Sequence, residues 1–394
     1  MKTIVNEFLN SVSDRMPCEV IYWDGERVNF GRDRPQIRIH IKSPNVIRDI
    51  MNSLSLGFGE NYMDGNIVVE GDLQKLIGIK YEEDARKFKV SNKTKMKILF
   101  NYIKTLNTVK RAKKNISHHY DLGNDFYRLM LDEGMTYSCA YFKNENDTLE
   151  KAQENKYELI CRKLDLKDGD RLIDVGCGWG GMIIYAAKRF NVKATGVNIS
   201  ENQYEYAKKR IKEECLEGKA DVLLKDYRDV KGKFNKFVSI GMFEHVGKRY
   251  SRLFFKKARE ILEDKAIGVL HTIARNVYEP TDSWTRKYIF PGGYIPVLSD
   301  ILRDMAVEGF YIIDVENLRP NYAKTLDEWI KRFESNIDKI KTMFDERFIN
   351  MWRLYLNAAS VSFKVGKLNV YQIVFSNSLR GTVPLNRSYI YENW

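Results

Sequence analysis

The run RLIDVGCGWGG, from Arg171 to Gly181, has the strongest chemical signature in the chain. Its first half reads as a short buried strand, because Leu172, Ile173 and Val175 are apolar and β-prone. Four closely spaced glycines follow: Gly176, Gly178, Gly180 and Gly181. Glycine is needed where the backbone turns tightly and approaches a ligand, and a periodic helical stretch comes next. The segment therefore predicts a strand–loop–helix that binds a cofactor.

The position of Asp174 narrows the cofactor, because it stands two residues before the first glycine. The glycine spacing alone does not, since Gly176, Gly178 and Gly181 also fit the GxGxxG pattern of dinucleotide-binding folds. With Asp174, the loop is typical of a methyltransferase that uses S-adenosylmethionine (SAM), in which no pyrophosphate is bound. The expected cofactor contacts here are Asp174, Gly176, Cys177, Gly178 and Gly180. The alternative is a glycine turn in some other α/β protein.

Further cofactor contacts are expected after the next two strands. The second strand should end near Asn198, where an acid often binds ribose hydroxyls, and an amide can also bind a diol. Gln203 is the natural helper of Asn198. Asp226 and Tyr227 follow the third strand, where a partner of adenine would lie. For Asn198 and Asp226, an ordinary cap or turn role is the alternative.

These motifs lie in a region of alternating strands and helices that begins at residue 115. Its strand-like runs are RLIDV, KATGV, ADVLL, KFVSI, AIGVLHTI, FYIIDVENL and NVYQIVF. The alternation predicts an α/β fold, a Rossmann-like doubly wound sheet covered by helices on both faces. A mainly helical insertion, from about 324 to 366, precedes the last strand. The SAM-dependent methyltransferase domain is expected to span 115–394.

Residues 1–85 are predicted to form a small α+β domain. An Asp24-Gly25 turn joins two β-rich runs, which is a hairpin signal. Ser43 followed by Pro44 is typical of a helix start, with the serine as cap.

The segment 86–114 differs in composition from both neighbours. It holds eleven lysines and arginines and no acid, and apolar residues recur in it at helical spacing. This pattern predicts a basic amphipathic helix that binds an anionic membrane surface. A solvated linker is the alternative; nucleic acid is not expected, because no recognition fold accompanies the charge.

The overall composition is that of a folded protein with 394 residues and a formal charge of +12. No apolar run reaches the roughly 18 to 20 residues of a membrane-spanning helix, and the amino terminus does not read as a signal peptide. The five cysteines lack CxxC spacing, which favours reduced thiols and a cytoplasmic location. Cys18, Cys161 and Cys215 are expected to be buried small apolar residues.

Reading outward from the loop, the chain resembles the cyclopropane fatty acid synthase family, which includes the mycolic acid cyclopropane synthases. Matching strings, in family order, are HYDLGNDFYRLML, MTYSCAYF, LIDVGCGWGG, SIGMFEHVG, LHTI, IFPGG and NYAKTLDEW. The upstream phrase GENYMDGNIVVEGDL resembles the amino-terminal domain of the bacterial phospholipid enzymes and implies a lipid-binding role for 1–85.

The resemblance implies a reaction and a location. A methyl group passes from SAM to the cis double bond of an unsaturated acyl chain in a membrane phospholipid, and loss of a proton closes a cyclopropane ring. A bound bicarbonate ion accepts that proton. The resemblance further implies peripheral association with the inner face of the cell membrane, and a homodimer.

The family's bicarbonate cradle carries over to five positions: Cys139, Glu244, His271, Ile273 and Tyr322. Backbone N–H groups of Cys139 and Ile273, and the side chains of His271 and Tyr322, could donate hydrogen bonds to an anion. Glu244 would share a proton with it. The alternatives are a helix cap for Glu244, a core histidine for His271 and simple packing for Cys139.

Several other residues bear on the cofactor site, on metal binding and on covalent catalysis. Tyr137 and Ser138 are expected to contact the cofactor from the side opposite the glycine loop. His118 and His119 lack a third ligand at suitable spacing, so no metal is expected. Ala359 stands where several bacterial members carry a cysteine, which argues against a nucleophilic thiol there. Two other functions remain open: N-methylation of a small amine, and lipid binding without catalysis.

Overall fold

The computed structural model describes residues 2–81, 122–291, 293–378, 384–392 and 394. The predicted basic helix over 86–114 lies outside these described residues. Contacts divide the chain into two compact units. The first takes its residues from Met1–His119, Pro280–Gly292 and Trp329–Val365, and the second from Tyr120–Glu279, Gly293–Glu328 and Gly366–Trp394.

The second unit is built on a seven-stranded sheet in the order β10-β11-β9-β8-β5-β6-β7. The strands are β5 (Arg171–Val175), β6 (Lys193–Asn198), β7 (Ala220–Leu224), β8 (Phe234–Ile240), β9 (Leu262–Ala274), β10 (Tyr311–Asn317) and β11 (Asn369–Ser376). Only β11 runs against its neighbours in this sheet, since it pairs antiparallel with both β9 and β10. All seven predicted strands are confirmed.

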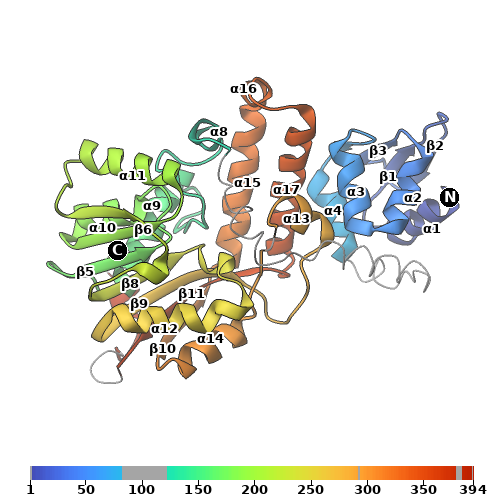
Figure 1. Ribbon diagram of the computed structural model, residues 1–394. Coiled ribbons are helices and arrows are strands. Elements are labelled where there is room, and N and C mark those ends of the chain that lie inside the picture. Colours follow the sequence, from blue (N-terminus) through green and yellow to red (C-terminus); the bar gives the residue numbers. More distant parts are fainter. Residues whose placement is uncertain (1, 82–121, 292, 379–383, 393) are drawn as a thin grey trace. The chain divides into compact units, whose positions relative to one another are not determined.

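Helices cover both faces of this sheet, as Figure 1 shows. One face carries α9 (Leu149–Lys163), α10 (Gly181–Phe190) and α11 (Glu201–Glu213), and the other carries α12 (Ser251–Ile261) and α14 (Leu298–Val307). Each helix layer packs on the sheet through its own apolar core. The apolar residues of α10 illustrate why: Ile183, Ala186 and Ala187 recur at helical spacing and are all buried. The predicted doubly wound fold is therefore confirmed.

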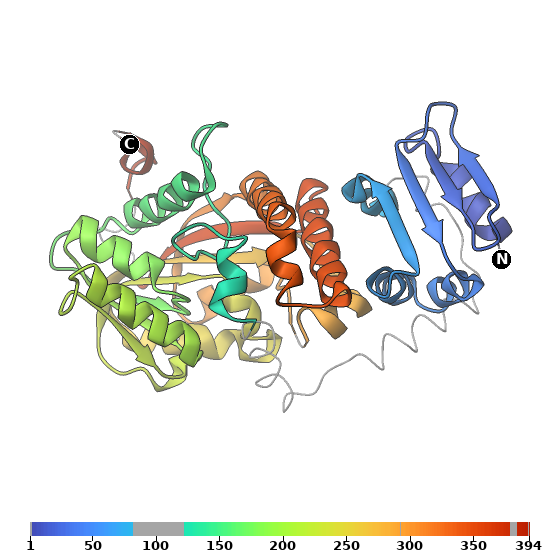
Figure 2. The same ribbon diagram turned by 90° about the horizontal axis from the view of Figure 1, so that it is seen from above.

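The carboxyl end of the chain returns to the α9 side of the sheet. Figure 2 shows the short helix α18 (Ser388–Tyr391) beside α9. Arg162 Nη1 donates to the backbone oxygen of Glu392 over 2.9 Å, which ties this segment to α9.

The strand order reverses at β5, which has β6 on one side and β8 on the other. In open α/β sheets such a switch point opens a crevice at the carboxyl ends of the two strands. The glycine loop follows β5, and Glu244 follows β8. The topology thus brings the two predicted centres of chemistry to one edge of the sheet.

The first unit contains a four-stranded sheet in the order β2-β1-β3-β4. Its elements are α1 (Lys2–Val12), β1 (Cys18–Ile21), β2 (Arg27–Phe30), β3 (Ile37–Ile41), α2 (Pro44–Asn52), α3 (Leu54–Met63), β4 (Ile67–Gly71) and α4 (Leu73–Gly78). β1 and β2 form the predicted antiparallel hairpin. Ser43 accepts from the N–H of Asn45, and Pro44 opens α2, so that predicted helix start is also confirmed.

The predicted helical insertion forms α15 (Arg319–Ser335), α16 (Ile337–Lys341) and α17 (Glu346–Lys364). Within the first unit, α3 packs against both α17 and α13 (Ser283–Tyr288). Gly59 of α3 shows how close this packing is, since a Cβ there would lie 2.1 Å from Cδ1 of Trp284. Glu60 accepts hydrogen bonds from Lys287 and Tyr288 over 2.5 and 2.6 Å. Segments late in the chain thus complete the core of the first unit.

The cysteine prediction is confirmed in part. Cys18 and Cys161 are buried, whereas Cys215 is exposed, so the prediction for Cys215 was wrong. Cys215 follows the end of α11 with a positive φ of 54°, a turn conformation that holds the residue at the surface.

The described part of the chain holds no helix that is both long and apolar enough to cross a bilayer. Its His, Cys, Asp and Glu side chains form no group of three or more that could bind a metal ion. His118 and His119 lie outside the described residues.

Candidate active site

The glycine loop is shaped by its attachment to the neighbouring strand. The N–H groups of Gly176 and Cys177 both donate to the backbone oxygen of Val197 at the end of β6, over 3.0 and 3.1 Å. Gly176 has a φ of 90°, and a Cβ there would lie 2.5 Å from Cβ of Met242. Only glycine combines this conformation with this close approach. The loop therefore presents backbone, not side chains, to the crevice.

Asp174 offers a buried carboxyl oxygen that could bind a cationic cofactor. Its side chain is buried, and Oδ1 has no hydrogen-bond partner among the described residues. Burial raises the pKa of Asp174 to about 7, while the nearby ammonium of Lys156 opposes this shift. A buried carboxyl oxygen without a partner fits a ligand that brings positive charge, as SAM does with its amino and sulfonium groups.

Lys156, which the sequence did not predict as a site residue, lies close enough to Asp174 to lower the pKa of that carboxyl group. It is fully buried in α9, and its Nζ donates to Oγ of Ser138 over 3.0 Å. Burial lowers the pKa of Lys156 to about 8, whereas Asp132, Cys139 and Asp174 raise it. The available signal was spacing: Lys156 stands seven residues after Leu149, on the buried stripe of α9.

Asn198 and Gln203 lie together, but Asn198 is mostly committed to the loop. Its Nδ2 donates to the oxygen of Gly178 over 2.9 Å and to Oε1 of Gln203 over 3.0 Å. Its Oδ1 accepts from the N–H of Ser200 over 2.9 Å. Contact with a ribose diol would therefore use the second lone pair of Asn198 Oδ1 and the amide hydrogens of Gln203.

Asp226 makes contacts that are those of a turn. Its carboxylate accepts from Nε and Nη2 of Arg228 over 2.8 and 2.6 Å, and from the N–H of Arg228 over 3.0 Å. The neighbouring Tyr227 packs edge-to-face on Phe254, with ring centroids 5.4 Å apart. These contacts agree with the turn role that was the alternative, and the predicted contact of Asp226 and Tyr227 with adenine stays a prediction.

Tyr137 and Ser138 approach the loop from a second segment. The Tyr137 ring lies 5.3 Å from that of Tyr127, which lies 5.2 Å from the ring of Trp179 in the loop. The buried Ser138 would lie 4.0 Å from a Cβ placed on Gly241, at the end of β8. Both predicted residues are therefore at the carboxyl edge of the sheet, close to the loop.

Glu244 lies directly after β8, in the 3₁₀ turn Phe243–His245. Its Oε1 accepts from the N–H of Ile273 over 2.5 Å, and its Oε2 is buried without a partner among the described residues. Burial raises the pKa of Glu244 to about 7, and the hydrogen bond from Ile273 opposes this. The Ile273 N–H, which was expected to be available to an anion, thus donates to Glu244 instead.

Cys139 and Tyr322 are joined through Leu318. The Sγ of Cys139 lies 3.9 Å from the oxygen of Leu318, and the N–H of Tyr322 donates to the same oxygen over 3.2 Å. The N–H of Leu318 donates to Val370 over 2.8 Å, and Val370 lies opposite Ile273 in the sheet. Burial raises the pKa of the Cys139 thiol well above its ordinary value, so this thiol stays neutral.

His271 completes the set from within β9. It is 2% exposed, and its Nδ1 lies 3.1 Å from Nε2 of Gln372 on β11. Burial lowers the pKa of His271 well below its ordinary value, and Lys156 and Lys163 lower it further, so the imidazole is neutral. All five cradle residues therefore lie on connected elements of the second unit.

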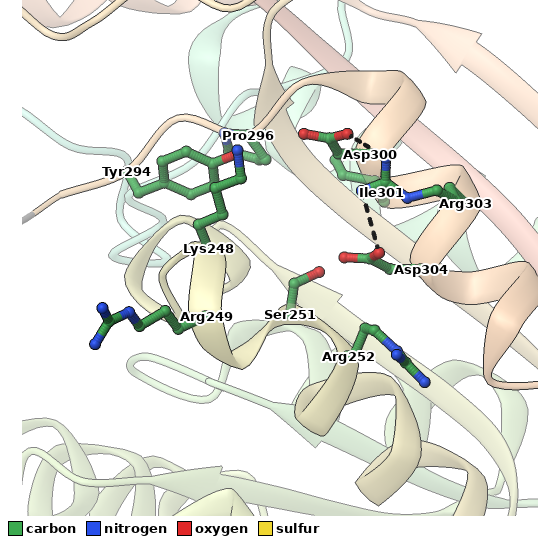
Figure 3. Close-up of a pocket in the computed structure, with 10 residues that line it drawn as sticks. All are labelled: Lys248, Arg249, Ser251, Arg252, Tyr294, Pro296, Asp300, Ile301, Arg303 and Asp304. Atoms are coloured by element: carbon green, nitrogen blue, oxygen red, sulfur yellow. Dashed lines mark hydrogen bonds and ion pairs between the residues drawn. The ribbon is translucent and has the colours of Figure 1, made fainter.

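A cavity of about 180 Å³ lies between the first turns of α12 and α14. Figure 3 shows the Ser251 hydroxyl and the Asp304 carboxylate turned toward it, whereas Arg249 points away. Asp300 and Asp304 both pair with Arg303, at 3.0 and 3.5 Å. None of the predicted site residues lines this cavity.

Most of the chain is similar in sequence to known proteins. A family model described as mycolic acid cyclopropane synthetase matches residues 107–373, and one described as a domain of unknown function matches residues 4–93. The chain is 36% identical over 361 residues to a cyclopropane-fatty-acyl-phospholipid synthase of Escherichia coli K12, covering 89% of this chain and 90% of that protein. It is 35% identical to a probable fatty acid methyltransferase of Pseudomonas putida, covering 91% of each.

A solved structure agrees with these relatives. Mycolic acid cyclopropane synthase CmaA1, complexed with SAH and CTAB, superposes with a TM-score of 0.62 at 32% identity. The match covers 67% of this chain and 97% of that one.

Proposed function

The chain belongs to the mycolic acid cyclopropane synthetase family of SAM-dependent methyltransferases, and we propose that it forms cyclopropane rings in membrane phospholipids. The methyl group of SAM is transferred onto the cis double bond of an unsaturated acyl chain. The new methyl group then loses a proton, and the ring closes. Bicarbonate is the proposed acceptor of that proton.

The glycine loop, Asp174 and Gln203 would hold SAM, which supplies an electrophilic methyl group on its sulfonium. An alkene is a weak nucleophile that no base can activate by deprotonation. The protein therefore contributes proximity, orientation and the exclusion of water. Cys139 and His271 suit a carbocation-like reaction, because both are buried and uncharged, and a neutral thiol is a much weaker nucleophile than a thiolate.

One observation carries the proposed role of bicarbonate: Oε2 of Glu244 is buried and has no partner among the described residues. A fully ionised carboxylate would repel an anion. Because burial raises the pKa of Glu244 to about 7, the group can hold a proton near neutral pH and share it with the anion. The His271 ring and the Tyr322 hydroxyl are the proposed neutral donors to the same ion.

Membrane association is the second part of the proposal. Support comes from an aromatic–basic patch, defined here as Lys248, Arg249, Val277 and Tyr278. Val277 and Tyr278 are 66% and 63% exposed, and Nζ of Lys248 lies 5.7 Å from the centroid of the Tyr278 ring. Exposed apolar side chains beside cations fit the headgroup region of an anionic membrane.

Further parts of this proposal follow from the composition of the chain and from the family. The basic segment 86–114 adds positive charge for the same membrane surface, on its cytoplasmic side, and the domain 1–85 binds lipid. The enzyme is proposed to act as a homodimer, which light scattering of the purified protein would measure.

The test uses labelled SAM and vesicles of cis-unsaturated phospholipid, with and without added bicarbonate in carbonate-free buffer. We expect ring-containing acyl chains that depend on bicarbonate. Vesicles of the saturated phospholipid are the matched control and should give no product. Transfer of label to small amines but not to lipid would contradict the lipid function. Ring formation at the full rate without bicarbonate would contradict only the proposal that bicarbonate accepts the proton.

A further inference from the structure

A row of polar side chains crosses the sheet beside the site. By strand register, Glu316 of β10 lies directly opposite Gln372 of β11, and Gln372 lies directly opposite His271 of β9. Side chains paired in this way share one face and lie about 4.5–5.5 Å apart at Cβ. Gln372 is fully buried, and the neighbouring pair on the same face, Val374 and Val269, is apolar. Burying polar side chains in an apolar core costs free energy unless they are hydrogen-bonded, so this row must have hydrogen-bond partners.

Lys163, at the end of α9, fixes the orientation of this row. Its side chain is fully buried, and its Nζ donates to Oε1 of Gln372 over 2.7 Å and to the Glu316 carboxylate. A lysine nitrogen donates here and a carboxamide NH₂ cannot accept, so the Gln372 atom that faces Lys163 must be the oxygen. The amide nitrogen of Gln372 therefore faces His271.

This orientation decides which nitrogen of His271 carries a proton. The amide nitrogen of Gln372 can only donate, and it lies 3.1 Å from Nδ1 of His271, so Nδ1 must accept. A neutral imidazole has one N–H, and the tautomer is set by the hydrogen bond that the other nitrogen makes. We propose that Lys163 and Gln372 are positioning residues that hold His271 as the tautomer protonated at Nε2.

The consequence for the reaction rests on the proposed function. An Nε2–H group can donate to a bound anion, whereas the opposite tautomer would present a lone pair and repel it. Lys163 and Gln372 touch neither substrate nor cofactor in this scheme. They act through His271, from the side of the sheet that α9 covers.

The direct test is the ¹⁵N NMR spectrum of the protein labelled at histidine. The chain has only five histidines, and the signals that disappear in His271→Asn identify those of residue 271. We expect an unprotonated Nδ1 and a protonated Nε2. Gln372→Glu offers only acceptors, so it should place a proton on Nδ1. Lys163→Met frees the amide to rotate and should give a mixture of tautomers.

Val374→Ala is the matched control, because Val374 is buried on the same strand and face but has an apolar side chain that cannot hydrogen-bond to the row. Its His271 signals should equal those of the wild type. A wild-type Nδ1 that carries the proton would overturn the proposal. So would an unchanged Nε2–H tautomer in both Gln372→Glu and Lys163→Met.

A kinetic measurement separates this proposal from the proposed function. Gln372→Met removes the donor at nearly constant volume, and it should raise the bicarbonate concentration for half-maximal ring formation on the order of tenfold. The KM for SAM should stay within about twofold, as in Val374→Ala. The NMR spectra could show the expected tautomers while ring formation does not depend on bicarbonate. That result would overturn the role of bicarbonate but not the assignment of the proton to Nε2 of His271. An unchanged bicarbonate response in Gln372→Met would overturn the positioning role.

Discussion

Ile273 donates its backbone N–H to Oε1 of Glu244 over 2.5 Å, and this contact gives the two oxygens of that carboxyl group different roles. Oε1 is fixed to the backbone of β9, two residues beyond His271. Oε2 is left buried and without a partner in the described part of the chain. When Glu244 is protonated, the free Oε2 is the oxygen that can donate to an anion.

The first prediction concerns the pH dependence of stability at Glu244. Its pKa is about 7 in the folded protein against an ordinary value of 4.5, because burial disfavours the charge. The folded state therefore binds the proton more tightly, and stability falls as pH rises from 4.5 through about 7. Glu244→Gln stays neutral, so above this range it should raise the free energy of unfolding by roughly 1–3 kcal/mol while abolishing ring formation.

Denaturant unfolding at a series of pH values, with SAH binding as the check on the site, measures this effect. The difference in stability between the variant and the wild type should vanish below pH 4.5. Glu60→Gln is a useful control, because the pKa of Glu60 is lowered, and loss of that group should destabilise the protein at neutral pH. Parallel pH profiles for Glu244→Gln and the wild type would refute the assigned pKa.

The second prediction concerns Asp174 and the cofactor. Asp174→Asn removes the charge that would pair with cationic SAM, and affinity should fall about 10- to 100-fold. In the wild type, affinity should strengthen as pH rises through about 7, because Asp174 then ionises. Calorimetric titration with SAM measures both effects. Asp229→Asn, an exposed acid, is the control. Equal affinity in Asp174→Asn and the wild type would exclude this contact.

The third prediction concerns Lys156, a buried cation among acids. Lys156→Met leaves Asp132 and Asp174 buried without their cation, and breaking such a group costs about 3–5 kcal/mol. The pKa of Asp174 should rise further, because Lys156 is the group that lowers it. Lys151→Met, exposed on the same helix, should change the unfolding midpoint little. Similar denaturation curves for the two variants would mean that Lys156 is not a structural counter-ion.

The sequence predicted those features that local pattern determines. The seven strands and the glycine loop follow from apolar runs and from glycines at a tight turn, which depend only on neighbours in the chain. The hairpin at Gly25 and the start of α2 at Pro44 are equally local. The residues of the proposed cradle came from family resemblance; His271 and Ile273 lie on β9, beside the end of β8 after which Glu244 follows.

The features that were missed depend on pairing between distant segments. Lys163, Glu316 and Gln372 meet only because β11 enters the sheet between β9 and β10. No spacing along the chain announces that arrangement. The engagement of Ile273 with Glu244 is likewise a contact across 29 residues. The turn role of Asp226 was not missed: it was the alternative from the sequence, and it depends on Arg228 only two residues away.

The last prediction concerns the aromatic–basic patch. Each basic residue near an anionic membrane contributes about 1 kcal/mol, so Lys248→Gln with Arg249→Gln should weaken binding to anionic vesicles roughly 30-fold. Tyr278→Ser should weaken binding to neutral and anionic vesicles alike, because it removes apolar contact rather than charge. Lys209→Gln on α11, an exposed lysine outside the patch, is the control for charge. Co-sedimentation at several salt concentrations separates the two contributions, since only the electrostatic one is screened. Wild-type binding that is equal for neutral and anionic vesicles would exclude the patch, because its cations would then contribute nothing.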